Sequence, residues 1–108
     1  MDYEEQEKLE ELFEKYGEYN NPDIVEFKDL KDKPFECEQV CAVMFLYEKL
    51  LPENKSEIWF FHGEHDKLFI GSSFTIFEPF TEEDVKRAIT FGISVSDDGD
   101  GFEIYASM

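Results

Sequence analysis

The stretch SVSDDGDGFEIY holds three aspartates and two glycines, and it is the run that most suggests metal chemistry. An EF-hand calcium loop needs carboxylates or amides at positions 1, 3 and 5, glycine at 6 and glutamate at 12. With Gly101 at position 6, Asp98 and Asp100 fill positions 3 and 5, but positions 1 and 12 are serines. The flanks alternate with a period of two, as strands do, and Asp and Gly suit hairpin turns. We therefore predict a hairpin turn, with a cation site at Asp98 and Asp100 as the alternative.

A second candidate site combines two cysteines with two histidines in the pattern C-x3-C-x20-H-x2-H. Cys2His2 is a zinc ligand set, although the gap between these pairs is longer than in the usual finger. Its members are Cys37, Cys41, His62 and His65. The competing interpretation is that the cysteines share a helix in the core and the histidines bracket a solvated hairpin loop. Cys41 could also be a nucleophile beside His62, but its apolar surroundings disfavour a thiolate. We predict no catalytic residue and no cofactor.

A regular row of glutamates marks the first predicted helix, residues 2–17. The intervals are three or four residues, which places the carboxylates along one side of a helix. The row consists of Glu4, Glu7, Glu11, Glu14 and Glu18. Neighbours are roughly 5–6 Å apart along the axis, close to the roughly 6–7 Å between phosphates of a DNA strand. The row predicts either a mimic of nucleic-acid charge or simply the solvated face opposite Leu9, Leu12, Phe13 and Tyr16.

Net charge narrows the class of partner. The chain has 27 acidic residues against 10 basic ones, a net charge of -17, and both halves share the excess. Such a surface opposes direct binding of DNA, RNA or an anionic membrane and favours basic proteins. The alternative is that the acidity serves solubility alone. The start of the sequence resembles no signal peptide and no apolar run could span a bilayer, so we expect a cytoplasmic protein.

Aromatic residues supply a second kind of contact. Aromatics make up 17% of the 108 residues, enough with 42% hydrophobic residues to build a core. Tyr and Trp are frequent anchors of interfaces. Trp59 lies in the sequence IWFF, which places apolar side chains on both faces of a predicted strand. Either this strand is covered on both faces or one face meets a partner chain, and a homodimer is therefore a further prediction.

Periodicity and capping signals predict the elements of a single domain, residues 1–108. Helices are expected at 2–17, 34–51 and 81–92, the second being the central buried one and the third beginning at a Thr81 N-cap. One hairpin has arms Ile58–Phe61 and Leu68–Ile70, with residues 73–77 as a further strand; another hairpin flanks the aspartate run. The predicted fold is α+β, with a small antiparallel sheet of four to five strands in two hairpins.

The predicted function is that of a small acidic, non-enzymatic binding protein that mimics nucleic-acid charge and inhibits a basic nucleic-acid-binding protein. The second hypothesis is a metal- or small-ligand-binding domain, and the third is a small enzyme. The partner surface is expected along the glutamate row and around Trp59.

Overall fold

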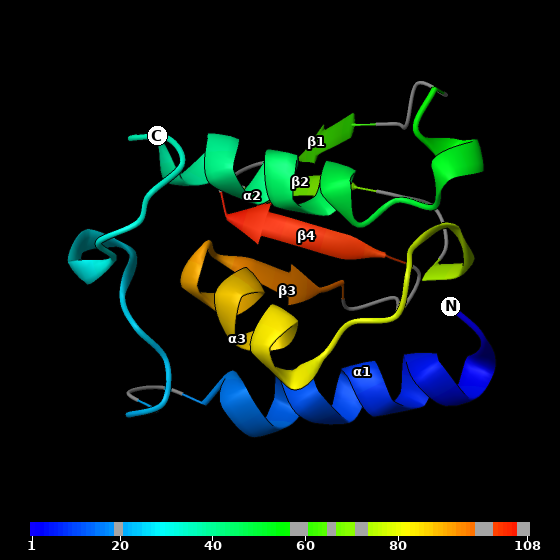
Figure 1. Ribbon diagram of the computed structural model, residues 1–108, viewed down its shortest axis with the longest axis horizontal. Coiled ribbons are helices and arrows are strands. Elements are labelled where there is room, and N and C mark those ends of the chain that lie inside the picture. Colours follow the sequence, from blue (N-terminus) through cyan, green and yellow to red (C-terminus); the bar gives the residue numbers. More distant parts are fainter. Residues whose placement is uncertain (19–20, 57–60, 65–66, 71–73, 97–100, 106–108) are drawn as a thin grey trace.

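Helices and antiparallel strands make up the computed structural model, which describes residues 1–18, 21–56, 61–64, 67–70, 74–96 and 101–105 (Figure 1). The α-helices of these residues are α1 (Tyr3–Tyr16), α2 (Glu38–Glu48) and α3 (Glu82–Thr90). The strands are β1 (Phe61–Glu64), β2 (Lys67–Ile70), β3 (Ile93–Val95) and β4 (Phe102–Tyr105). Single 3-10 turns occur at Phe27–Asp29, Pro52–Asn54 and Phe74–Ile76.

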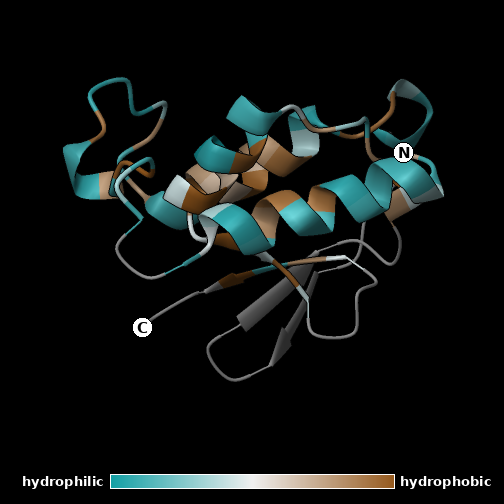
Figure 2. Cartoon of the chain, turned by 90° about the horizontal axis from the view of Figure 1, so that it is seen from below, coloured by the Kyte–Doolittle hydropathy of each residue, from teal (hydrophilic) through white to brown (hydrophobic). Residues whose placement is uncertain are grey.

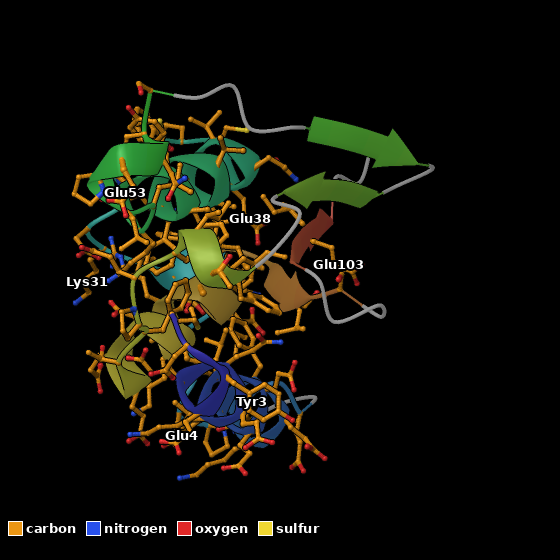
Figure 3. All side chains as sticks on the ribbon, turned by 90° about the vertical axis from the view of Figure 1, so that its right-hand side faces the viewer. Tyr3, Glu4, Lys31, Glu38, Glu53 and Glu103 are labelled. Atoms are coloured by element: carbon orange, nitrogen blue, oxygen red, sulfur yellow. The ribbon has the colours of Figure 1, made fainter. Side chains whose placement is uncertain are left out.

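The strands form an antiparallel sheet in the order β1-β2-β4-β3. Ile93 lies opposite Ile104 and Val95 opposite Phe102, so these four apolar side chains share one face, as their alternation predicts. The helices lie on one side of the strands, with α2 over β4 and α1 and α3 beside β3 (Figures 1 and 3). β1 and β3 are the two edge strands.

The mixture of helices and strands is α+β in the broad sense, but the predicted sheet needs correction. The strand expected at residues 73–77 is not formed; Phe74–Ile76 is a 3-10 turn in which the Phe77 amide donates to the Phe74 carbonyl at 3.2 Å. Phe74 and Phe77 both enter the core, 1% and 0% exposed, which a strand's alternation would not allow. The two hairpins join through the pairing of β2 with β4. The predicted sheet of up to five strands is therefore wrong.

The second helix is shorter and less buried than predicted. α2 begins at Glu38 rather than near Pro34, because Cys37 has the extended backbone of an N-cap, and it ends at Glu48. Cys41, Ala42, Phe45 and Leu46 are buried, whereas Val40, Met44 and Tyr47 are exposed. The sheet and α3 cover only one side of α2, and its other side is exposed. The prediction that α2 is the central buried helix is therefore wrong.

The third helix confirms its predicted start. The Thr81 hydroxyl accepts from the Asp84 amide at 3.1 Å, and the Asp84 carboxylate accepts from the Thr81 amide at 2.9 Å. This reciprocal capping box satisfies two backbone donors at the helix start. Phe80 and Val85, on either side of it, are both buried and fix the direction in which the chain enters the helix.

Phe102 on β4 is the centre of the core. Its ring lies 5.0 Å from the rings of Phe74 and Phe77, 5.3 Å from that of Phe80 and 6.0 Å from that of Phe13. Aromatic pairs at these distances contribute beyond the area they bury. One side chain thereby joins α1, the 3-10 turn, the segment before α3 and the sheet.

We expect Phe102→Ala to lower the free energy of unfolding by about 3–5 kcal/mol, because it removes a fully buried ring at the junction of four segments. Phe102→Leu keeps most of the apolar volume and should cost less. Urea denaturation of both variants measures the difference. A loss for Phe102→Ala below about 1 kcal/mol would contradict this packing.

Candidate functional site: the acidic face of α1

Local sequence and the core together fix the orientation of α1. The Asp2 side chain accepts from the Glu5 amide at 2.8 Å and the Glu5 side chain accepts from the Asp2 amide at 2.9 Å, which forms a second capping box. Leu9, Phe13 and Tyr16 are buried against the rest of the chain. With this face fixed, the residues opposite it must point to solvent.

Four of the five predicted glutamates form one exposed row on this outer face. Glu4, Glu7, Glu11 and Glu14 lie within α1 and are exposed. Glu18 is exposed too, but it follows the helix, which ends at Tyr16 with Gly17 as its C-cap, so the helical row is one residue shorter than predicted. Figure 2 shows the outer side of α1 as mainly hydrophilic, and Figure 3 places Glu4 on the side remote from α2.

An exposed tyrosine lies beside this row. Tyr3 is 72% exposed. Its pKa is raised, first because its hydroxyl hydrogen-bonds to the Glu7 carboxylate, and then because the negative charges of Glu7 and Glu10 oppose ionisation. The raised pKa of Tyr3 reports the negative potential of this face. A neutral phenol among carboxylates is also a typical interface anchor.

Contacts with α3 hold the C-terminal end of α1. The Tyr16 hydroxyl donates a hydrogen bond to the Glu82 carboxylate, which is the main cause of the lowered pKa of Glu82. The ammonium group of Lys15 lies 3.7 Å from the same carboxylate. The glutamate row therefore lies on a helix whose C-terminal end is bound to α3 by a hydrogen bond and an ion pair.

A groove of 490 Å³ adjoins the C-terminal half of the row, and the sequence did not predict it. α1 contributes Glu10, Phe13, Glu14 and Gly17; the end of α3 and β3 contribute Ile89, Gly92, Ile93, Ser94 and Val95. Its apolar side chains lie between two carboxylates and the edge of a strand. The spacing of Glu10 and Glu14 was visible in the sequence, but their position beside β3 follows only from tertiary packing.

The predicted metal ligands are not brought together among the described residues. Cys37 is the exposed N-cap of α2 while Cys41 is buried within it, so the two thiols do not share the expected helix face. His62 belongs to β1 rather than to the predicted loop. His65, Asp98 and Asp100 lie outside the described residues, and within the described ones no group of three metal-binding side chains occurs.

The remaining sequence hypotheses concern the aspartate run and Trp59. The run is flanked by β3 and β4, and the Ser96 amide donates to the Gly101 carbonyl at 2.9 Å, so its flanks are not the helices of an EF-hand. Trp59 lies outside the described residues, and both its partner role and the homodimer stay predictions.

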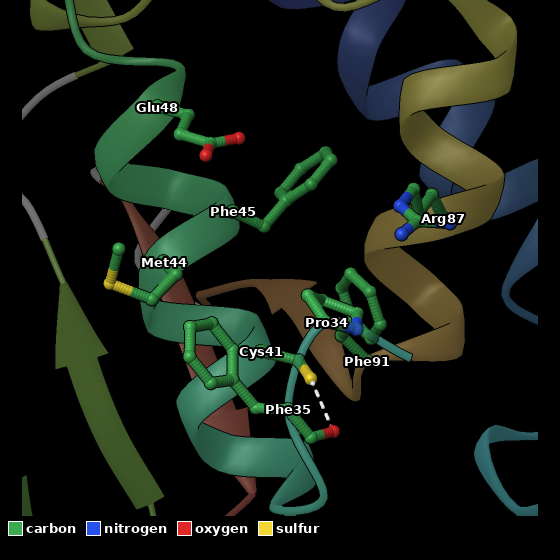
Figure 4. Close-up of a pocket in the computed structure, with 8 residues that line it drawn as sticks. All are labelled: Pro34, Phe35, Cys41, Met44, Phe45, Glu48, Arg87 and Phe91. Carbon is green, nitrogen blue, oxygen red and sulfur yellow. Dashed lines mark hydrogen bonds between the residues drawn. The ribbon is translucent and has the colours of Figure 1, made fainter. Parts of the chain in front are cut away.

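A small pocket of 140 Å³ lies between α2 and α3 (Figure 4). The buried Cys41 thiol donates to the Phe35 carbonyl at 3.3 Å. Arg87 also lines the pocket, but its guanidinium lies 5.0 Å from the centre of the Phe91 ring and 3.4 Å from the Asp32 carboxylate. The pocket could hold a group about the size of a benzene ring.

Glu38, the first residue of α2, carries a perturbed carboxyl. Partial burial raises its pKa, because a less hydrated site disfavours the charged form. The folded chain then holds this proton more tightly than the unfolded chain does. The fold therefore gains stability from this group as pH falls toward the ordinary carboxyl pKa and loses it as pH rises through the raised value.

We expect Glu38→Gln to raise the melting temperature at pH 7 and to have little effect at pH 3, where the parent carboxyl is already neutral. The exposed neighbour Glu36→Gln is the matched control for the loss of one negative charge. Melting temperatures at both pH values test this. A gain at pH 7 no larger than that of the control would refute the burial argument.

Comparison with known proteins finds no match among protein-family models, curated proteins or solved structures. None of the helices in the described part of the chain combines the length and apolarity needed to cross a membrane.

Proposed function

We propose that this protein is an acidic, non-enzymatic binding protein whose outer α1 face presents nucleic-acid-like charge to a basic nucleic-acid-binding protein. The observation that carries the proposal is the exposed row of Glu4, Glu7, Glu11 and Glu14 on a firmly held helix. Rigidity matters because a charged surface that is already ordered loses little entropy on binding.

The charge density of the row supports this choice. Glu4 and Glu14 are ten residues apart, so the four charges extend over roughly 15 Å of helix, about one charge per 5 Å. A single DNA strand carries one charge per roughly 3.4 Å of axis. The row therefore approaches the linear charge of one strand, which a groove lined with Lys and Arg is built to accept.

The net charge supports a basic partner, and the free thiols support a reducing compartment. A net charge of -17 repels nucleic acids and attracts cationic surfaces, so competition with nucleic acid for a shared basic partner is the natural mode. Both cysteines are free, as a reducing compartment such as the cytoplasm would keep them, and we propose that compartment.

A displacement experiment tests the proposal. Cell lysate is loaded on DNA-cellulose, and the column is eluted with this protein or with polyglutamate of the same total charge. We expect this protein to release a distinct set of basic DNA-binding proteins, because ordered charge fits a DNA-binding groove better than a flexible polyanion. Release of nothing beyond what polyglutamate releases would refute the proposal.

The second test removes the row. Glu4, Glu7 and Glu11 are replaced together by Gln, which keeps side-chain length and helix propensity. At about 0.2–1 kcal/mol for each charge, binding to the displaced partner should weaken roughly 3- to 160-fold, with a slower on-rate that is less sensitive to salt. Stopped-flow association at several salt concentrations measures both effects.

The matched control replaces Glu36, Glu53 and Glu78 by Gln. These glutamates are exposed and lie outside α1, so the variant has the same net charge as the row variant. If both variants lose affinity equally, overall acidity and not the α1 row determines binding, and the proposed surface is wrong.

Small-ligand binding in the α2–α3 pocket is the second candidate. Its volume of 140 Å³ and a lining that combines the apolar Phe35, Met44 and Phe45 with polar groups favour it. It ranks lower because Arg87, the polar group best suited to an anionic ligand, already pairs with Asp32 and stacks on Phe91.

A further inference from the structure

The outer edge of β3 is unoccupied by any described strand. β3 pairs with β4 on one side and is the last strand of the sheet. An edge strand presents a row of backbone donors and acceptors to whatever lies beside it. The groove between α1 and β3 lies along this edge, because all three residues of β3 line it.

The register identifies which backbone groups point outward. The Ser96 amide bonds to the Gly101 carbonyl, so Ser96 and Gly101 form a hydrogen-bonded pair. Pairs alternate along an antiparallel ladder, which makes Ser94–Glu103 the next hydrogen-bonded pair. The amides and carbonyls of Ile93 and Val95 therefore point away from β4. Ile93 is 2% exposed, so its backbone groups are covered, and partly exposed Val95 supplies the accessible amide and carbonyl of this edge.

The groove walls indicate the chemistry of an occupant. Phe13, Ile89 and Val95 supply apolar surface, and Glu10 and Glu14 supply two carboxylates one helical turn apart. A long basic side chain satisfies both parts, since its methylene stem covers the apolar surface while its charged head reaches a carboxylate. Arginine suits this best because its guanidinium binds carboxylates bidentately.

We propose that this groove is a docking site for an extended, arginine-bearing segment of the basic partner, which adds to the sheet as a strand beside β3. The proposal rests on the proposed function and specifies its partner. Main-chain hydrogen bonds from Val95 give affinity, and alternate side chains facing α1 give specificity. Glu14 belongs to both the groove and the row, so the strand and the charged face engage one partner continuously.

The first test uses a blocked peptide of alternating arginine and threonine, seven residues long. Titration should give saturable binding, and amide hydrogen exchange by NMR should slow at least about tenfold at Val95, because its amide becomes hydrogen-bonded. Absence of binding, or unchanged exchange at the Val95 amide, would overturn the proposal.

Two further peptides test strand addition directly. In one peptide the backbone amide of every arginine is N-methylated, and in the other that of every threonine. Because the amides of alternate residues point to opposite edges of an extended peptide, each peptide lacks the N–H donors of one edge only. A strand uses only one edge to pair with β3, so one peptide should lose at least about fivefold in affinity and the other should keep it. Equal affinities of the two would exclude pairing with β3.

Variants of this chain provide a second line of evidence. Val95→Pro removes an outward amide without removing a bond to β4, and edge strands tolerate proline there. It should bind the peptide about 2- to 12-fold more weakly than Val95→Ala, which keeps the amide. Glu10→Gln with Glu14→Gln should weaken binding about 2- to 30-fold, while Glu36→Gln with Glu53→Gln should not.

These experiments distinguish failure of the docking site from failure of the proposed function. If Val95→Pro is folded and binds as Val95→Ala does, the docking site is wrong even if the protein displaces basic proteins from DNA-cellulose. If Val95→Pro fails to fold, the two N-methylated peptides with the parent chain decide. If the column shows no displacement but the peptide slows exchange at Val95, the groove binds basic strands and the proposed function is wrong.

Discussion

The packing of aromatic rings around Phe102 is the interaction on which the rest of the structure depends. A chain with net charge -17 repels itself when it folds, and apolar burial must outweigh that repulsion. The rings of Phe13, Phe74, Phe77 and Phe80 all approach Phe102, so the burial is concentrated at one point. This concentration leaves the outer surface of α1 free for charges that contribute nothing to the core.

Three basic residues, Lys15, Lys49 and Arg87, join different segments of the chain. Lys49 on the loop side of α2 pairs with Asp84 of α3 at 2.8 Å, with both side chains about four-fifths buried. Arg87 pairs with Asp32, and Lys15 with Glu82. The acids in these three pairs, Asp32, Glu82 and Asp84, do not belong to the row on α1. Stability and binding thus use different acids of the same chain.

Local signals in the sequence predicted local structure well. The Thr81–Asp84 capping box, the buried face of α1 and the alternation of Ile93 and Val95 each depend on neighbours within a few residues, so they could be recognised without a fold. The 3-10 turn at Phe74–Ile76 could not, because five residues with alternating polarity fit a strand equally well. The exposure of Val40, Met44 and Tyr47 escaped prediction because an apolar helix does not reveal how many sides are covered.

Within the candidate site, the glutamate row could be predicted from the sequence because helical spacing alone creates it. The groove could not be predicted in this way. Glu10 and Val95 are 85 residues apart in sequence and line one groove only after α1 packs beside the sheet. Pairing of β2 with β4 likewise connects two hairpins whose sequences show no sign of each other. Such non-local relations follow from tertiary packing, which periodicity does not encode.

The contact between Phe13 and Phe102 also constrains how the chain is made. The two rings are 89 residues apart in sequence, and at roughly 5–20 residues per second a ribosome needs about 4–18 s to synthesise that interval. During this time Leu9 and Phe13 have been translated but lack the strand that buries them. The many carboxylates of α1 flank these apolar residues in sequence. Because like charges repel, they oppose aggregation of the nascent helix until β4 has been synthesised.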